Sequence, residues 1–158
     1  MVKMQQNQQG FTLIELLIVI VIIAVLAVTV FVALNPVKRI KDAQDARRVT
    51  DVENILTAIH EYIVDNKGNL PTGLSLGMSE VQLGTDTSGC AVSTGGCTAT
   101  PSACLDLTTP LAKYLKSIPY DPSVGSAGKT DYTVAVDSNG IVTVRACGAE
   151  NTTIFQSR

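Results

Sequence analysis

The most uneven feature of the chain is a continuous apolar run near its N-terminus. Residues 16–34 read LLIVIVIIAVLAVTVFVAL, and over residues 11–34 the only strongly polar residue is Glu15. As a helix rising about 1.5 Å per residue, this longer segment spans roughly 36 Å, which exceeds the roughly 30 Å hydrocarbon core of a bilayer. It is too long for a strand and for the apolar core of a cleaved secretory signal. The pattern therefore predicts a transmembrane helix over residues 11–34.

A second pattern, with helical periodicity, follows this run. Pro36 cannot donate a backbone hydrogen bond, so the helix is predicted to kink or open there. Beyond it, apolar residues recur at intervals of three and four, at Val49, Val52, Leu56, Ile59 and Ile63. This stripe predicts an amphipathic helix within residues 35–67 that docks one face on another surface. Gly68 follows as a helix stop.

The charged residues of this second helix are balanced, with six basic and six acidic side chains between residues 37 and 67. We interpret them as a solvated helix surface. The alternative is that they form ion pairs between the subunits of a polymer, each worth about 0 to 1 kcal/mol when exposed. His60 lies beside the apolar stripe on a mostly polar face, and we assign it no catalytic role.

The remaining residues, 68–158, are predicted to form a small head. Residues 108–116 have the pattern of a short helix, while residues 132–136 and 141–144 alternate and are rich in β-branched side chains. The loop between the last two segments contains an Asn-Gly pair, which is a strong hairpin signal. An antiparallel sheet packed on the striped helix follows, because a small sheet needs such a partner to be stable. The predicted fold class is α+β.

The cysteines of the chain are Cys90, Cys97, Cys104 and Cys147. Residues 68–109 contain seven Gly, five Ser and eight Thr, too few apolar side chains for a core, so disulfides are expected to stabilise this segment. Four cysteines allow three pairings. We favour Cys90 with Cys97 across a Gly-Gly turn, and Cys104 with Cys147 on the final strand. A zinc site is the alternative, but the chain has no CxxC pair.

Composition excludes several classes of function. The net charge is −2 and charged residues make up 16% of the chain, which argues against a nucleic-acid module with a basic face. A single histidine excludes His-rich metal sites, and any Ser-His-Asp set would have to use it. No convergent nucleophile, base and orienting group is visible. We expect no enzyme and, calcium apart, no cofactor.

Two cues to the orientation of the apolar helix conflict. Lys3 precedes the helix, whereas Lys38, Arg39 and Lys41 follow it, and by the positive-inside rule this would place the C-terminal side in the cytoplasm. The cysteines instead favour an oxidising compartment for the head.

Glu15 is an anomaly within the apolar run. A carboxylate at this depth costs about 2.5 to 3.5 kcal/mol on insertion scales unless it finds a partner, and it is by default a functional-site hypothesis. No Lys or Arg lies within a helical turn of it. An amine on a neighbouring copy, or an α-amino group created by cleavage after Gly10, could neutralise it.

The residues around Glu15 resemble the prepilin peptidase recognition sequence of type IV pilins and the related pseudopilins. They read GFTLIELL at residues 10–17, after a short polar leader at residues 1–10. The resemblance implies cleavage between Gly10 and Phe11 on the cytoplasmic face, N-methylation of Phe11, and a head held outside the cytoplasm. It also implies that Glu15 pairs with the amino terminus of a neighbouring subunit during filament assembly. This orientation agrees with the cysteines.

The resemblance implies a structural subunit of a type IV pilus-like filament that serves adhesion, motility or DNA uptake. Its expected partners are other copies of itself, prepilin peptidase, the inner-membrane assembly machinery and, before assembly, membrane lipid. It is expected to cross the cytoplasmic membrane once and then to enter a cell-surface pilus or a periplasmic pseudopilus. The alternatives are a type II secretion pseudopilin and a minor pilin that acts as an adhesin or a DNA-binding tip.

Residues 118–122, with Asp131 and Tyr132, resemble the segment before the last hairpin of major type II secretion pseudopilins. That region binds calcium in those proteins. The resemblance suggests Asp121, Asp131 and Asp137 as oxygen ligands, of which calcium takes six to eight. The alternative is that Asp121 begins a turn and Asp137 begins the hairpin loop.

Overall fold

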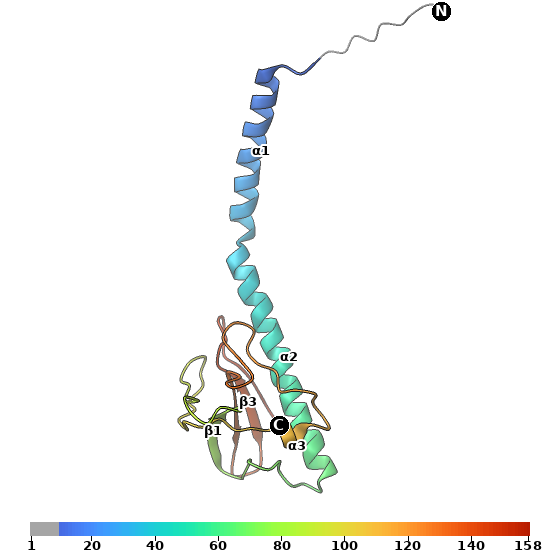
Figure 1. Ribbon diagram of the computed structural model, residues 1–158, viewed down its shortest axis with the longest axis vertical. Helices are drawn as coiled ribbons and strands as arrows, with labels where there is room; N and C mark the ends of the chain where they lie inside the picture. Colours follow the sequence, from blue (N-terminus) through green and yellow to red (C-terminus); the bar gives the residue numbers. More distant parts are fainter. Residues whose placement is uncertain (1–9) are drawn as a thin grey trace, which may run out of the picture. The chain divides into compact units, whose positions relative to one another are not determined.

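The computed structural model describes residues 10–158 and shows two compact units (Figure 1). The first unit ends at Arg39, and the second comprises Ile40–Arg158. The predicted leader, apart from Gly10, lies outside the described residues.

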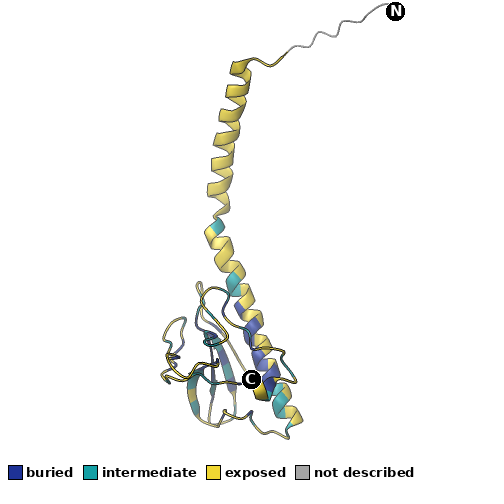
Figure 2. Ribbon diagram, in the orientation of Figure 1, coloured by how far each residue is buried: buried dark blue, intermediate teal, exposed yellow. Residues whose placement is uncertain are grey.

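Helix α1 (Leu13–Leu34) forms from the apolar run and has no buried residue. Thr12 is its N-cap and forms a capping box with Glu15, which satisfies backbone amides that the first helical turn leaves without partners. The predicted apolar helix is confirmed, and its exposed surface is continuous along its length (Figure 2).

One residue, Asn35, separates α1 from helix α2 (Pro36–Asp65). Its backbone is left-handed, with φ 40° and ψ 71°, a conformation that Asn tolerates better than most residues. Its side-chain Oδ1 accepts a 3.4 Å hydrogen bond from the Lys38 amide. Pro36 fits the first position of α2 because the amide hydrogen that it lacks has no partner there in any helix. The predicted opening of the helix therefore occurs at Asn35.

Within the second unit, α2 packs one face on a sheet (Figure 2). Its buried apolar residues are Val52, Ile55, Leu56, Ala58 and Ile59. The predicted stripe is confirmed at its centre, but Val49 is 38% exposed. The interpretation of the charges as a solvated surface is wrong for Arg48 and Asp51, which are both buried. Asp51 accepts a 2.9 Å hydrogen bond from the buried Tyr132 hydroxyl, which explains its position.

The sheet has four antiparallel strands in the order β1-β2-β3-β4. They are β1 (Met78–Gln82), β2 (Tyr132–Val136), β3 (Val142–Ala146) and β4 (Ile154–Ser157). The β2–β3 hairpin is confirmed, with Val136 opposite Val142, whereas β1 and β4 were not predicted. The short helix α3 (Thr108–Leu111) is shorter than the predicted segment.

The core lies between α2 and the inner face of the sheet. Alternate residues of β2 and β3 point into it, namely Tyr132, Val134, Val136, Val142, Val144 and Ala146. This period of two is the direct result of strand geometry, and it matches the apolar face of α2. The α+β fold class is confirmed.

Truncation of Ile55 tests the contact between α2 and the sheet. Ile55 is fully buried, whereas Ile40 on the same helix is 59% exposed. We expect Ile55→Ala to lower the free energy of unfolding by about 2 to 5 kcal/mol. The control, Ile40→Ala, removes the same atoms and should change it by less than about 0.5 kcal/mol. Chemical unfolding of the full chain in detergent measures both values, and equal losses would contradict the assigned core.

Candidate processing and assembly site

The start of α1 places the predicted cleavage point in an accessible position. Gly10 and Phe11 precede the helix, and the Phe11 side chain is 87% exposed. No atom lies within 4 Å of the position that a Cβ on Gly10 would occupy. Within the described residues, nothing therefore blocks access of a peptidase to the bond between Gly10 and Phe11.

Glu15 is held by the residue that caps its own helix. Its Oε2 accepts hydrogen bonds of 2.8 Å from both the amide and the hydroxyl of Thr12, and the Thr12 hydroxyl accepts one of 3.3 Å from the Glu15 amide. Among residues 10–158, Glu15 Oε1 has no hydrogen-bond partner. Thr12 was missed as a site residue, although Thr-x-x-Glu before an apolar run is the sequence signature of a capping box.

The rest of α1 presents an apolar surface with no unsatisfied side-chain donor. Its one hydroxyl, on Thr29, donates a 2.8 Å hydrogen bond to the Leu26 carbonyl of the preceding turn. The helix is long and apolar enough to cross a membrane, and none of its most apolar window is buried inside the protein.

Residues 5–31 match the family model of the prokaryotic N-terminal methylation motif. The chain carries the signature of prepilins. This match supports a type IV pilin-like or pseudopilin precursor and agrees with the resemblance seen at residues 10–17. No curated protein and no solved structure shows significant similarity to the chain. Cleavage after Gly10, methylation of Phe11 and the role of Glu15 in assembly stay predictions for this pilin-like precursor.

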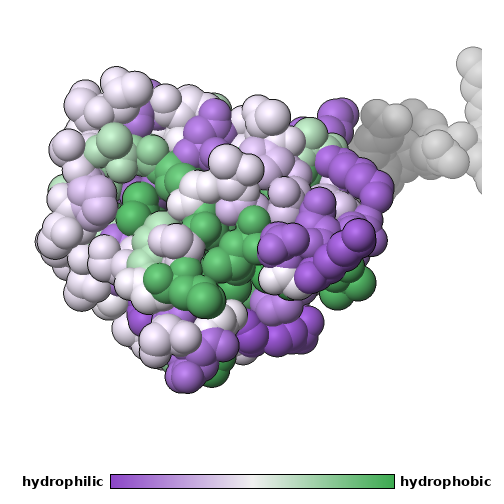
Figure 3. All heavy atoms as spheres, turned by 90° about the horizontal axis from the view of Figure 1, so that it is seen from below, coloured by the Kyte–Doolittle hydropathy of each residue, from purple (hydrophilic) through white to green (hydrophobic). Residues whose placement is uncertain are grey.

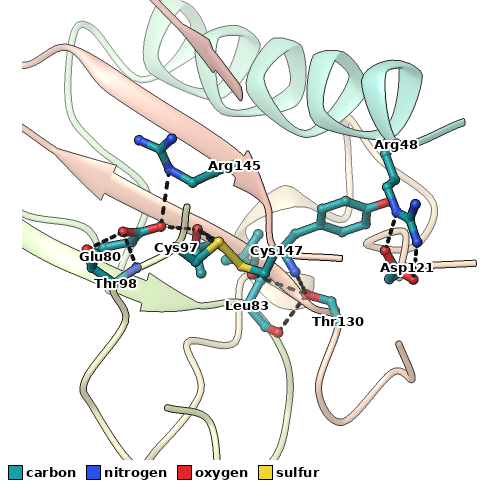
Figure 4. Close-up of a disulfide and its surroundings, with 11 residues drawn as sticks. Arg48, Glu80, Leu83, Cys97, Thr98, Asp121, Thr130, Arg145 and Cys147 are labelled. Carbon is teal, nitrogen blue, oxygen red and sulfur yellow. Dashed lines mark hydrogen bonds and ion pairs between the residues drawn. A yellow bond between two sulfur atoms is a disulfide. The ribbon is translucent and has the colours of Figure 1, made fainter. Parts of the chain in front are cut away.

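The four cysteines form two disulfides, and neither is one of the two that we favoured, Cys90 with Cys97 and Cys104 with Cys147. Cys90 bonds to Cys104 and Cys97 bonds to Cys147, the latter shown in Figure 4. The chain folds back through a Cys90 amide bond to the Ser102 carbonyl, which brings Cys90 beside Cys104. The turn that holds Cys97 instead lies against β1, because Thr98 donates its amide to Glu80 at 2.8 Å. Cys97 therefore reaches the end of β3 rather than Cys90.

The three aspartates predicted to bind calcium do not form one site. Asp121 accepts hydrogen bonds from Arg48, and Asp137 accepts the amides of Asn139 and Ile141 within its own loop. In the described part of the chain, no group of three His, Cys, Asp or Glu residues is placed to hold a metal ion. These positions do not fit a calcium site built from all three carboxylates.

Asp121 and Asp131 have opposite electrostatic environments. Burial alone would raise the pKa of Asp121, but hydrogen bonds from Arg48 and Ser123 outweigh it and hold the pKa below its usual value. Burial raises the pKa of Asp131, and the nearby Asp121 charge raises it further. The ionised form of Asp131 is therefore disfavoured in the fold.

His60, which we predicted to have no catalytic role, contacts its own helix. Its Nδ1 lies 2.8 Å from the Leu56 carbonyl oxygen, and its side chain is half-buried.

The two disulfides should contribute unequally to stability. Cys97 and Cys147 are 50 residues apart, whereas Cys90 and Cys104 are 14 apart. Loop-closure entropy predicts losses of about 4 and about 3 kcal/mol, respectively, when each pair is replaced by serine. Chemical unfolding of the two double variants checks this order. Alkylation of Cys97→Ser should label Cys147, and labelling of Cys90 or Cys104 instead would contradict the pairing.

Removal of the Asp131 charge should stabilise the precursor at neutral pH. An acid whose pKa is raised in the fold costs stability that sets in above its ordinary pKa and is complete above the raised one. We expect Asp131→Asn to raise the melting temperature at pH 7, and the gain over the parent to shrink as the pH falls through the raised pKa. Asn also tolerates the left-handed backbone at this position, where φ is 61°. The exposed control, Asp42→Asn, should show no such gain. A gain that is unchanged in acid would contradict the assigned cause.

Proposed function

We propose that the pilin-like precursor is a structural subunit of a filament outside the cytoplasm, cleaved after Gly10 and assembled through α1. The observation that carries this proposal is an apolar helix with no residue buried in its own protein, joined to the methylation motif. The role is that of a building block, with further copies of the chain as its main partners.

The surface of α1 suits both a membrane and a filament. In lipid, its apolar side chains lie among acyl chains of similar polarity, so association between such helices depends on packing rather than on water exclusion. Replacement of lipid by the α1 helices of other subunits therefore keeps the surface covered. The face of the head seen in Figure 3 is largely polar, with one gathered apolar patch.

Glu15 supplies the polar contact that such a bundle of helices needs. Cleavage after Gly10 would create an α-amino group on Phe11, one turn from Glu15. The bonds from Thr12 occupy Oε2, which leaves Oε1 to accept from the amine of a neighbouring subunit. In an apolar surrounding this ion pair would replace two costly unpaired charges. It would also fix how far each subunit is inserted.

The two disulfides support an orientation with the head outside the cytoplasm, since such bonds persist in oxidising compartments. The N-terminus would then face prepilin peptidase and the inner-membrane assembly machinery. The mature subunit would start at Phe11, and a long surface filament would indicate a pilus. A short periplasmic filament would instead indicate a secretion pseudopilus, and a low copy number at one filament end would indicate a minor pilin.

The assembly role of Glu15 predicts a specific loss in variants. We expect Glu15→Ala to be made and cleaved normally but to abolish filaments in sheared surface and periplasmic fractions, measured by electron microscopy and immunoblotting. Mass spectrometry should find Phe11 as the N-terminal residue in both the parent protein and Glu15→Ala.

Glu15→Gln is the matched control, because its amide oxygen can still accept from Thr12 while the charge is lost. We expect it to fail in assembly as Glu15→Ala does. Normal filament yield from either variant would contradict the ion pair, and normal yield from Glu15→Gln alone would assign Glu15 to helix capping.

A further inference from the structure

The largest fully buried side chain of the protein belongs to an arginine. Arg48 lies on α2 and is 0% exposed. A buried guanidinium remains charged at all relevant pH values, and its burial is costly unless it is paired and hydrogen-bonded. The groups around Arg48 therefore show what this position requires.

Four oxygen contacts surround the guanidinium. Nε donates to Asp121 Oδ2 at 2.6 Å and Nη2 donates to Asp121 Oδ1 at 3.1 Å, the two-pronged geometry that arginine forms with carboxylates. Nη1 donates to Asp45 Oδ1 at 2.8 Å, and Nη2 also donates to Ser123 Oγ at 2.9 Å. Figure 4 shows Arg48 reaching from α2 to Asp121. Two carboxylates thus share one buried cation.

Asp121 also organises the turn that follows it. Its Oδ1 accepts from the amides of Ser123 at 2.8 Å and Val124 at 3.1 Å. A third carboxylate is close, because a Cβ on Gly148 would contact both Asp121 and Asp131. Arg48 therefore fastens an acidic, oxygen-rich loop to the helix on which the sheet packs.

We propose that Arg48 is the built-in cation of this loop, so that the head folds without calcium. Calcium needs six to eight oxygen ligands, and here the carboxylate oxygens of Asp121 already accept from Arg48. A covalently attached charge also cannot dissociate, so the order of the loop is independent of calcium concentration. Loss of the arginine charge leaves Asp121 and Asp45 beside a space that calcium can enter.

The test uses the full chain in detergent, with head unfolding followed by tyrosine fluorescence, since all four Tyr lie between residues 62 and 132. The variants are Arg48→Gln, the double variant Arg48→Gln with Asp121→Asn, and Arg47→Gln. Arg47 is the matched control because its side chain is 56% exposed and pairs only with Asp51 in the part of the chain that the structure describes. Each protein is melted in EGTA and in millimolar calcium, with magnesium as the control ion.

The parent and Arg47→Gln should melt at the same temperature in EGTA and in calcium. Arg48→Gln should melt more than about 10 °C lower in EGTA, as expected when a buried charge loses its partner, and calcium but not magnesium should raise its melting temperature. The double variant should recover part of the loss and should not respond to calcium. If Arg48→Gln shows no unfolding transition in EGTA, the appearance of an unfolding transition in calcium supports the proposal in the same way as a raised melting temperature.

Three results would overturn the proposal. They are a melting temperature of the parent that rises with calcium, a melting temperature of Arg48→Gln equal to that of Arg47→Gln, and an Arg48→Gln protein on which calcium has no effect. None of them bears on filament assembly, which is measured separately through Glu15.

Discussion

None of the 22 residues of α1 contributes to the protein's own core, and the rest of the structure has to be stable without them. Among the described residues, α2 is the one long helix that packs on the sheet of the head, and its buried face is confined to residues 48–59. Helix α3 adds a single buried residue, Leu111. The sheet supplies most of the remaining core through its two central strands, whose inner residues are almost all fully buried. A chain with much apolar sequence is therefore left with a thin core, because none of its most apolar segment is buried inside the protein.

Cross-links compensate for this thin core at the places where apolar contacts are few. The Cys97–Cys147 disulfide attaches the polar loop to the end of β3. The ion pair between Arg48 and Asp121, both with fully buried side chains, attaches the loop before β2 to the helix. Each link attaches a loop with few apolar side chains to an element of the core, β3 in one case and α2 in the other. The links therefore stabilise the edges of the head, while the valines of β2 and β3 stabilise its centre.

Features that depend on neighbouring residues could be predicted from the sequence. The apolar run, the interruption beside Pro36 and the β2–β3 hairpin each have their signals within a few residues. Strands β1 and β4 could not be found in this way, because they are short and carry polar residues such as Glu80 and Gln156. The burial of Arg48 depends on a partner 73 residues away, and the pairing of Cys97 depends on one 50 residues away. At the candidate site, Glu15 was found by its charge, while its partner Thr12 had a local signal that was overlooked.

The left-handed residue between the two helices has a mechanical consequence. A helix unfolds cooperatively because each turn stabilises the next, but Asn35 ends one such series and its side chain starts the capping of another. Tension or heat that unravels the end of α1 therefore meets a fresh helix terminus rather than a continuous ladder of hydrogen bonds. Asn35 therefore separates the unfolding of the two helices, so that α1 can unravel while α2 keeps its first turn.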